Sequence, residues 1–405
     1  MYMIFFGLAL LVSLFLAVAF LIRWTRIAQS LPWITSKSRY PLPDPIPKVS
    51  VIVPARNEEH NIEPCLTSLL AQDYPDLEII VVDDQSHDRT PDILARIKRE
   101  HEVTGDSSRT NGTRLHILDG QPCPQDWAGK NHALHQGYKM ARGDYLLFVD
   151  ADTRAHPMLV RNAVGFALHS RTGLLTLFHS CEFQCFWDSV VNSLIFYLAL
   201  FQKVEEYNNP DHKAANSHGP FLLFTRDAYE EIGGHEAIKA EVVEDLVLAE
   251  RIKEKKKRLT WAIAPDLLAS LPYPSLSDLR KGWGKVLFRA IERNPKLLYA
   301  DIVSPLVLGL YLLLPWALLI ALAVKGIIHG GDPVLFAVAS LALCQVLLVT
   351  ASHRLLEILF HLRPVYPYAY PLGVLVLGWI QWEAVIRFLT GKRVAWKGRH
   401  YREQM

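Results

Sequence analysis

The segment Leu77-Glu-Ile-Ile-Val-Val-Asp-Asp84 is a short apolar run that ends in two carboxylates. Two further runs have the same form, Val49-Ser-Val-Ile-Val53 and Tyr145-Leu-Leu-Phe-Val149. Short, nearly continuous apolar strands are typical of a parallel sheet that is covered by helices on both faces. Residues 59–71 and 91–100 lie between these runs and have the apolar spacing of helices. The chain therefore predicts an α/β domain.

The composition limits the class of protein. Of the 405 residues, 50% are hydrophobic and 21% are charged, which is too apolar for an ordinary soluble enzyme and too charged for a simple membrane bundle. With 43 Lys and Arg against 41 Asp and Glu, the net charge is +2, so we expect no nucleic-acid partner. The five cysteines are scattered and form no CxxC pair, which argues against a disulfide framework or a zinc ribbon. We expect a reducing compartment.

A first membrane span is predicted at the N-terminus. Residues 3–22 contain no charge, and about 20 helical residues cross a bilayer. Arg23 and Arg26 follow the apolar run and nothing basic precedes it, which favours an anchor over a cleaved signal peptide. The positive-inside rule then places the following chain in the cytoplasm.

Three more charge-free stretches lie at residues 302–324, 333–352 and 364–382. The first two predict a helical hairpin that turns at residues 329–333. The third contains three prolines, and a further crossing would export a basic tail, so we expect a re-entrant or interfacial segment there. These features predict a multi-pass protein of the cell (inner) membrane with two to three C-terminal membrane helices and a cytoplasmic catalytic domain.

These features divide the chain into six parts: an N-terminal anchor (1–22), a Pro-rich juxtamembrane linker (23–47), the α/β domain (48–270), an amphipathic interface segment (271–301), a C-terminal membrane region (302–390) and a basic cytoplasmic tail (391–405).

Acidic residues follow the predicted strands. Ligands of an open parallel sheet bind beyond the carboxyl ends of its strands, and there the sequence has Pro54-Ala-Arg-Asn-Glu58, Asp83-Asp84 and Asp150-Ala-Asp152. Hard carboxylate oxygens of this kind suit Mg²⁺ or Mn²⁺ carrying a diphosphate. Each acidic pair alone is more often a helix cap or a turn former. The acidic groups follow successive strands, and the sequence has no GxGxxG or GxxxxGK[ST] motif, the glycine-rich motifs that bind nucleotides in other α/β folds. This combination favours a metal–nucleotide site.

These motifs resemble those of the inverting family 2 glycosyltransferases, which have the GT-A fold. Residues 49–58 are similar to that family's opening strand and nucleotide-binding loop, and Asp150-Ala-Asp152 to its metal-binding DxD motif. Asp126-Trp-Ala-Gly-Lys-Asn-His-Ala-Leu134 is similar to its GKxxAL element. Ser217-His-Gly-Pro-Phe-Leu-Leu-Phe-Thr-Arg226 resembles the acceptor-side segment, and Glu244-Asp245 the motif that carries the base.

The resemblance implies roles for individual residues. The divalent metal, Mg²⁺ or Mn²⁺, is expected on Asp150 and Asp152, and the catalytic base is expected at Asp245, with Glu244 as the residue that orients it. The nucleotide-sugar donor is expected on eight residues: Pro54, Ala55, Asn57, Glu58, Asp83, Asp84, Lys130 and Asp150.

The chemistry is consistent with these roles. Loss of a nucleoside diphosphate leaves charge on phosphate oxygens, which a metal and Lys130 can neutralise, and the acceptor hydroxyl needs a base. The alternatives are a solvent-facing Lys130 and a Glu244-Asp245 pair that only caps a helix N-terminus.

Other candidates have weaker signals. His218 and Gly219 could contact the acceptor, although a lone His is more often structural. Cys181 and Cys185, at helical spacing, could bind a metal with His179 or could simply be core. Residues 186–201 fit a helix on the membrane, a helix that lines the acceptor entrance, or a buried core helix.

Two basic and aromatic segments could close the site. Arg280-Lys-Gly-Trp283 stands where processive synthases of the family have QxxRW, but the match is poor, which counts against polymerisation. Trp283 could still cap the site. In the tail, Trp396, Lys397 and Arg399 could gate the donor site or could only anchor the chain at the membrane.

The sequence thus predicts a membrane glycosyltransferase that transfers a sugar from a nucleotide-diphosphate donor, UDP-linked, to a lipid hydroxyl at the cytoplasmic face. It most resembles bacterial glycosyltransferases associated with hopanoid and carotenoid pathways. The alternatives are a polysaccharide synthase, a catalytically inactive scaffold with this fold, and a nucleotidyltransferase of similar topology.

Overall fold

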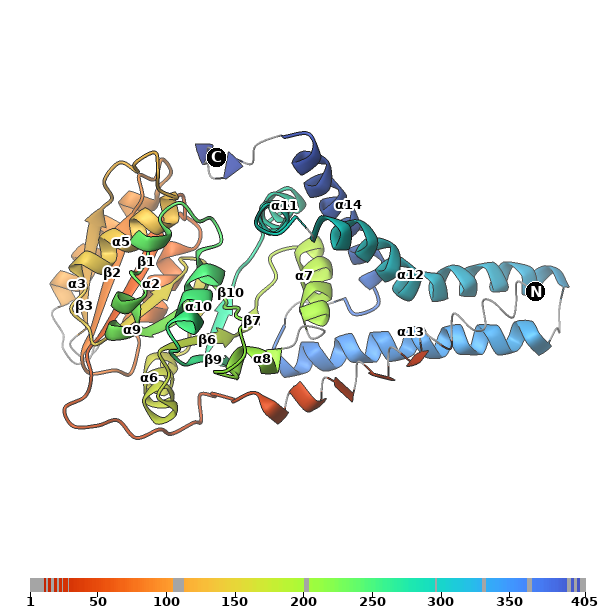
Figure 1. The fold of residues 1–405 in the computed structure, drawn as a ribbon, viewed down its shortest axis with the longest axis horizontal. Coiled ribbons are helices and arrows are strands. Elements are labelled where there is room, and N and C mark those ends of the chain that lie inside the picture. Colours follow the sequence, from red (N-terminus) through yellow and green to blue (C-terminus); the bar gives the residue numbers. More distant parts are fainter. Residues whose placement is uncertain are drawn as a thin grey trace.

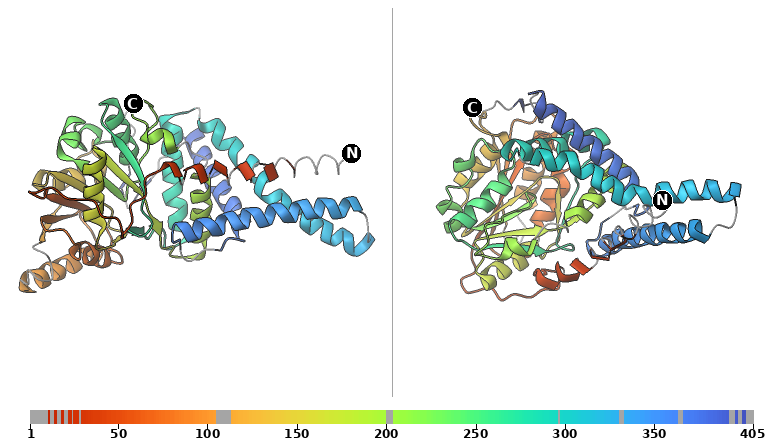
Figure 2. Two further views of the ribbon diagram at one scale, coloured as in Figure 1. Left: turned by 90° about the horizontal axis from the view of Figure 1, so that it is seen from below. Right: turned by 45° about the vertical axis from the view of Figure 1, so that its right-hand side comes forward.

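The structure is a computed structural model. It describes residues 31–104, 113–199, 204–295, 297–329, 333–362 and 366–391, part of residues 11–30, and two short strands near the C-terminus. The predicted N-terminal span therefore falls largely outside the described residues. The described chain forms a sheet domain from which a long helical hairpin extends (Figures 1 and 2).

The main sheet has seven strands in the spatial order β3-β2-β1-β4-β8-β6-β9. The strands β3, β2, β1 and β4 are parallel, whereas β8 is antiparallel to both β4 and β6. The three predicted strands are β1, β2 and β4, so the mostly parallel sheet is confirmed. The bounds are β1 Val49–Ala55, β2 Leu77–Asp83, β3 Arg114–Asp119, β4 Tyr145–Val149, β6 Leu174–Phe178, β8 Phe221–Thr225 and β9 Leu259–Ile263.

Helices cover both faces of this sheet, because alternate strand residues point to opposite sides. Val51 and Val53 belong to the core under α2 and α6, whereas Ile52 belongs to the core under α5, α9 and α10. All three side chains are completely buried. The bounds are α2 Ile62–Leu70, α3 Thr90–Thr104, α5 Gly129–Met140, α6 Leu159–Ser170, α9 Arg226–Glu231, the 3₁₀ helix η1 Glu236–Ile238 and α10 Glu244–Glu254.

A small second sheet corrects one reading of the cysteines. It consists of β5 (Thr153–Ala155), β10 (Leu268–Ser270) and β7 (Ser180–Cys181) in that order. Cys181 lies on a strand, so its spacing to Cys185 is not helical. The Cys181 sulfur lies 3.3 Å from Oγ of Ser270, which also lies 3.1 Å from Nε2 of His179. Both side chains are part of a buried hydrogen-bonded core.

The predicted linker is attached to the sheet domain rather than free. Ile34 is completely buried, and its N–H donates to the carbonyl of Ile263 over 2.9 Å. Ile263 in turn donates to the carbonyl of Pro32 over 2.9 Å. The Tyr40 ring packs edge-on against Phe166 of α6, with centroids 5.5 Å apart. Apolar residues at 34 and 40 explain this docking, which the proline content alone did not indicate.

The remaining helices form a layer beside the sheet domain. Their bounds are α7 Phe186–Ala199, α8 Val204–Asn208, α11 Leu276–Arg293, α12 Leu297–His329, α13 Pro333–Leu359 and α14 Tyr370–Leu389. The predicted hairpin corresponds to α12 and α13. By length and composition, Phe336–Leu359 and α14 could each cross a membrane. The prolines of the third stretch do not break α14, because Pro371 occupies its first turn, where a missing N–H costs nothing.

The helix α7 is a buried connection between the two layers. Val191, Leu194 and Tyr197 are completely buried, and Val190 touches Gly373 of α14. Of the three readings of residues 186–201, the buried helix therefore agrees with the structure, because both sides of α7 are covered.

Two glycines of α11 test how tightly this layer is packed. A Cβ on Gly282 would lie 2.4 Å from the ring of Tyr273, whereas a Cβ on Gly284 would meet nothing within 4 Å. We expect Gly282→Ala to destabilise the protein by about 1–3 kcal/mol through overpacking. The matched Gly284→Ala should stabilise it by up to about 1 kcal/mol, because alanine is the better helix former. Thermal unfolding of both variants in detergent measures the difference, and equal midpoints would contradict the packing.

Candidate functional site

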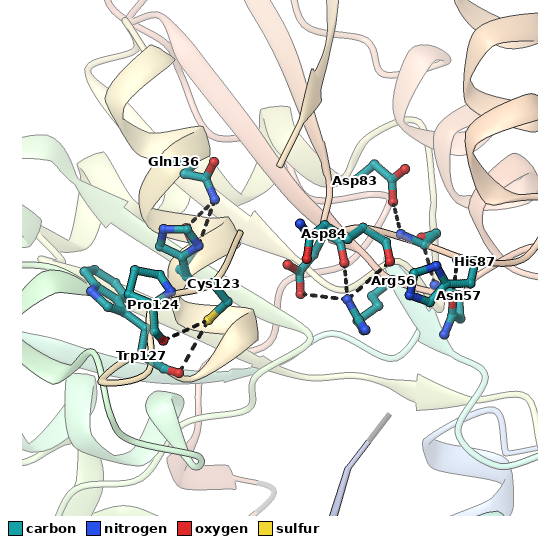
Figure 3. Close-up of polar contacts among 12 residues, drawn as sticks. Arg56, Asn57, Asp83, Asp84, His87, Cys123, Pro124, Trp127 and Gln136 are labelled. Carbon is teal, nitrogen blue, oxygen red and sulfur yellow. Dashed lines mark hydrogen bonds and ion pairs between the residues drawn. The ribbon is translucent and has the colours of Figure 1, made fainter. Parts of the chain in front are cut away.

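The loops after β1 and β2 bring the first predicted donor residues together. Pro54 and Ala55 end β1, and Ala55 lies opposite Asp83 at the end of β2. The N–H of Asp84 donates to the carbonyl of Ala55 over 2.7 Å. Nη1 of Arg56 donates to the carbonyl of Asp84 over 2.5 Å and lies 3.9 Å from its carboxylate (Figure 3). Asp83 and Asp84 are nearly completely buried, so this edge of the sheet concentrates negative charge beside a guanidinium.

Asn57 and Glu58 fix the first loop to the second. Asn57 has a left-handed backbone, with φ of 54°, which Asn tolerates better than most residues. Its N–H donates to Oγ of Ser86 over 3.0 Å, and its Oδ1 accepts from the N–H of His87 over 2.9 Å (Figure 3). The N–H of Glu58 donates to Oγ1 of Thr90 over 2.8 Å. The two loops therefore form one unit at the sheet edge.

A third group at this edge was missed from the sequence. Gln136 of α5 accepts from the N–H of Gln121 over 2.8 Å and contacts Nδ1 of His132 at 3.0 Å. The carbonyl of Trp127 accepts from the Cys123 thiol over 3.5 Å, and the Trp127 and His132 rings lie 5.4 Å apart. Figure 3 shows this group in the same view as the Arg56 group. Trp127, which stands two residues before the first residue of α5, was the feature of the sequence that could have indicated this group.

Lys130 joins two of the predicted acidic motifs. Its Nζ lies 2.7 Å from Oδ1 of Asp150, directly after β4, and 2.6 Å from Oε1 of Glu244, the first residue of α10. Burial opposes the charge of Lys130, but the two carboxylates raise its pKa well above the ordinary value. Burial alone would raise the pKa of Glu244. The positive charge of Lys130 and its hydrogen bond together have the larger effect, so the pKa of Glu244 is lowered. The solvent-facing alternative for Lys130 is inconsistent with these ion pairs.

Asp245 lies next to this cluster in a different electrostatic setting. Its carboxylate accepts from the N–H of Gly219 over 3.0 Å and from the N–H of Leu246 over 2.9 Å. Burial raises the pKa of Asp245 to about 7, and the Glu244 charge adds to that effect while Lys130 opposes it. A carboxyl with this pKa exchanges a proton near neutral pH, which suits a general base.

The DxD residues offer a partial metal site. Asp150 and Asp152 supply carboxylate oxygens two residues apart at the end of β4. Among the described residues, no three His, Cys, Asp or Glu side chains gather as a metal cluster. Two hard oxygen ligands nevertheless fit Mg²⁺ or Mn²⁺, because such ions commonly take their other ligands from water and substrate phosphates.

His218 is packed as a structural residue. Its imidazole lies 4.7 Å from the Trp261 ring and 5.3 Å from the Phe178 ring. Burial lowers the pKa of His218 to about 3, so the ring is neutral at physiological pH. The neighbouring Gly219 reaches the site instead, because a Cβ there would lie 3.4 Å from Asp245 and 3.7 Å from Lys130.

Of the predicted closing residues, only Trp283 has a contact of its side chain described. Nε1 of Trp283 donates to Oδ1 of Asn192 on α7 over 2.8 Å, so the indole faces the helical layer. Trp396 and Arg399 lie on the short strands β11 (Ala395–Trp396) and β12 (Arg399–His400), and Lys397 is outside the described residues. Figure 1 shows β11 and β12 beyond the end of α14.

Lys285 of α11 is a second residue that sequence reasoning missed. Lys130 is the main cause of the lowered pKa of Glu244, and the positive charge of Lys285 adds a smaller contribution in the same direction. Burial lowers the pKa of Lys285 itself, although Glu244 opposes the shift. A second ion pair joins the same two helices: Nη2 of Arg293 on α11 lies 2.7 Å from Oε2 of Glu250 on α10.

Comparison with known proteins agrees with this geometry. Residues 50–233 match the family described as Glycosyl transferase family 2. The 4,4'-diaponeurosporenoate glycosyltransferase of Staphylococcus aureus (strain bovine RF122 / ET3-1) is 27% identical over 264 residues, which cover 63% of this chain and 65% of that protein. The match thus spans slightly less than two thirds of that relative.

A solved structure shares the fold. It is a mannosyltransferase from Pyrobaculum calidifontis in complex with GDP-Man and Mn²⁺, with a TM-score of 0.52 and 21% identity over 96% of this chain and 99% of that chain. This chain and the mannosyltransferase therefore have the same fold. Residues 50–233 are therefore a family 2 glycosyltransferase domain, and its fold is GT-A.

Proposed function

We propose that this protein transfers a sugar from a nucleotide-diphosphate donor, UDP-linked, to the hydroxyl of a lipid at the cytoplasmic face of the membrane. The observation that carries the proposal is the meeting of Lys130, Asp150, Glu244 and Asp245 at the strand ends. The family match and the relative named for glycosylating diaponeurosporenoate support it. A panel of radiolabelled nucleotide sugars incubated with the detergent-solubilised protein and a bacterial lipid extract tests it.

The donor is held by the unit formed by the loops after β1 and β2. Pro54, Ala55, Asn57 and Glu58 supply one side of it, and Asp83 and Asp84 the other. Asp150 and Asp152 hold a divalent cation with the diphosphate, and this ion supplies neutralising charge when bound. Lys130 supplies a second positive charge from the protein itself.

Transfer is a single displacement at the anomeric carbon. The acceptor oxygen forms the new bond as its proton passes to the Asp245 carboxylate, and the bond to the phosphate oxygen breaks on the opposite side, which inverts the configuration. The leaving diphosphate keeps the electron pair, and Lys130 stabilises its charge. Glu244 acts through Lys130, which it holds at 2.6 Å.

The acceptor comes from the membrane side. The helical layer of α7, α11 and α14 lies beside the sheet domain (Figure 1), and the positive charge of Lys285 on α11 helps to lower the pKa of Glu244. We place Lys285 beside the donor diphosphate, as a second cation opposite Lys130. A gating role for Trp396, Lys397 and Arg399 is part of the same proposal, with the tail on the cytoplasmic side.

Asp152→Asn should abolish metal-dependent donor binding, because it removes an anionic oxygen from a site that has only two carboxylates. Titration calorimetry of UDP with and without Mn²⁺ measures the effect. Equal UDP affinity in the variant and the parent, with metal present, would show that Asp152 does not hold the ion.

Asp245→Asn should retain donor binding and lose on the order of 10²–10⁴-fold in kcat, the usual contribution of a positioned base. In the parent, activity should rise with pH up to about 7 and then level off, because the base must lose its proton, and burial together with the Glu244 charge raises its pKa to about 7. A pH profile of kcat/KM measures this. A variant that transfers sugar at the parental rate removes Asp245 from the mechanism.

Lys285→Ala should raise the donor KM about tenfold or more, because a charged hydrogen bond contributes roughly 1.5–3 kcal/mol. Lys285→Arg should keep most of the affinity. The matched control is Lys281→Ala on the same helix, since Lys281 is mainly exposed and lies 3.6 Å from Asp278. Steady-state kinetics in detergent separate them, and identical donor KM values for the two alanine variants would refute the assignment.

A further inference from the structure

Asp188, in the first turn of α7, is a buried carboxylate whose described hydrogen-bond donors are all neutral. The side chain is completely buried. Its Oδ2 accepts from the N–H of Gln184 over 2.9 Å and from the N–H of Tyr273 over 3.4 Å. Its Oδ1 accepts from Nδ2 of Asn192, one turn further along α7, over 2.5 Å. Burying a carboxylate among neutral donors costs free energy, so its presence here requires a physical reason.

The hydrogen bonds that lead away from Asp188 have a fixed direction. Burial raises the pKa of Asp188 to about 6, and its hydrogen bonds oppose the rise, so the group is mainly ionised at pH 7. A carboxylate only accepts hydrogen bonds, and an indole N–H only donates. The Asn192 amide between them must therefore turn its NH₂ group to Asp188 and its Oδ1 to Trp283, whose Nε1 lies 2.8 Å away.

The same carboxylate also holds the segment that adjoins α11. A Cβ on Gly282 would lie 2.4 Å from the Tyr273 ring, so this ring lies directly against one turn of α11. The N–H of Tyr273 donates to Asp188, and the next residue of the helix, Trp283, is held through Asn192. Asp188 is therefore connected to two adjacent residues of α11.

Other helices also hold α11, but with weaker control of its rotation. Both α14 and α12 contact it, and the contacts with α14 include two apolar clusters. Apolar packing has no preferred direction. Nη1 of Arg280 lies 3.7 Å from Oε2 of Glu383 on α14, a long and partly exposed ion pair. The short hydrogen bond of Trp283 therefore restricts the rotation of α11 more tightly than these contacts do.

Trp283 and Lys285 lie on nearly opposite sides of α11, because two residues along a helix differ in direction by about 200°. Arg293 follows Lys285 by about two turns, on a similar side, and its Nη2 lies 2.7 Å from Oε2 of Glu250 on α10. The positive charge of Lys285 helps to lower the pKa of Glu244, the first residue of α10. One side of α11 is thus fixed to α7 and the other is turned to α10, so the rotation of α11 sets the position of Lys285.

We propose that Asp188 is a positioning residue for donor binding, which rests on the proposed place of Lys285 beside the donor diphosphate. Through Asn192 and Trp283, the carboxylate fixes the rotation of α11 and so holds the ammonium group of Lys285 at the diphosphate. Asp188, Asn192 and Trp283 make no contact with the donor in this role. A carboxylate is required because it fixes the orientation of the Asn192 amide.

Asp188→Asn reverses the direction of these hydrogen bonds. The two backbone N–H groups keep the oxygen of the new amide, which turns its NH₂ group to Asn192. Asn192 then turns its own oxygen to that NH₂ group and presents a donor to Trp283, so the indole loses its acceptor. The exchanged pair, Asp188→Asn with Asn192→Asp, restores the hydrogen bonds, because a carboxylate at position 192 accepts from both neighbours.

The affinity for UDP in the presence of Mn²⁺, measured by titration calorimetry in detergent, tests the proposal. Asp188→Asn should weaken UDP binding roughly 3–10-fold, which is part of the effect of Lys285→Ala. The exchanged pair should bind UDP within about twofold of the parent. In a Lys285→Ala chain, Asp188→Asn should change the affinity by less than about twofold, because the group that it positions is gone. Parental affinity in Asp188→Asn, or no recovery in the exchanged pair, overturns the proposal.

Asn162→Ala is the matched control for the loss of a buried polar contact. Asn162 of α6 is buried, and its Nδ2 donates to the carbonyl of Thr35 over 2.7 Å. This variant should unfold at a lower temperature and keep the parental affinity for UDP. An equal loss of UDP affinity in Asn162→Ala and Asp188→Asn would show an effect of general stability and overturn the proposal.

A second measurement does not use the donor. In a Lys285→Cys chain, peptide mass spectrometry follows the rate at which a soluble maleimide modifies position 285. Asp188→Asn should raise this rate severalfold, because α11 is then less restricted, and the further change Asn192→Asp should restore it. An unchanged rate overturns the positioning. A parent that binds no UDP, with these rates as expected, refutes the proposed function and supports the positioning of α11.

Discussion

The ammonium group of Lys130 holds together parts of the chain that the sequence separates widely. It contacts Asp150 after β4 and Glu244 at the start of α10; Glu244 is buried and Asp150 is partly buried. Buried carboxylates without a cation are strongly unfavourable, so β4, α5 and α10 must keep their mutual positions. The sheet order, with β8 between β4 and β6, brings the Gly219 loop to the same place.

The same cluster explains why two adjacent carboxylates differ. Glu244 has Lys130 as a direct partner, and this charge keeps its pKa below the ordinary value. The hydrogen bonds described above for the Asp245 carboxylate both come from backbone N–H groups. Burial, together with the Glu244 charge, raises the pKa of Asp245 to about 7. One residue is thereby fixed as an anion, and its neighbour exchanges a proton near neutrality. Neighbouring acids with separated pKa values are the usual basis for divided roles in catalysis.

Much of the fold could be predicted from the sequence, because apolar runs and acidic strand ends are local signals. The strands β1, β2 and β4 and the α12–α13 hairpin follow from such runs. The docking of Ile34, the burial of α7 and the place of Lys285 could not be predicted, because they depend on which distant surfaces meet. The sequence also indicated Asp150 and Glu244 as separate motifs, and only the three-dimensional arrangement shows that Lys130 connects them.

The docked segment before the domain has a consequence for the edge of the main sheet. The strand β9 ends the strand order, and an exposed edge strand is a template for pairing with other chains. Here Pro32 and Ile34 occupy the hydrogen-bonding groups of Ile263, and Trp33 forms a bridge with the same residue. The proline offers no N–H to a further strand. A shortened protein that starts at residue 48 would free the hydrogen-bonding groups of Ile263 at this edge, so a catalytic fragment should begin before Pro32.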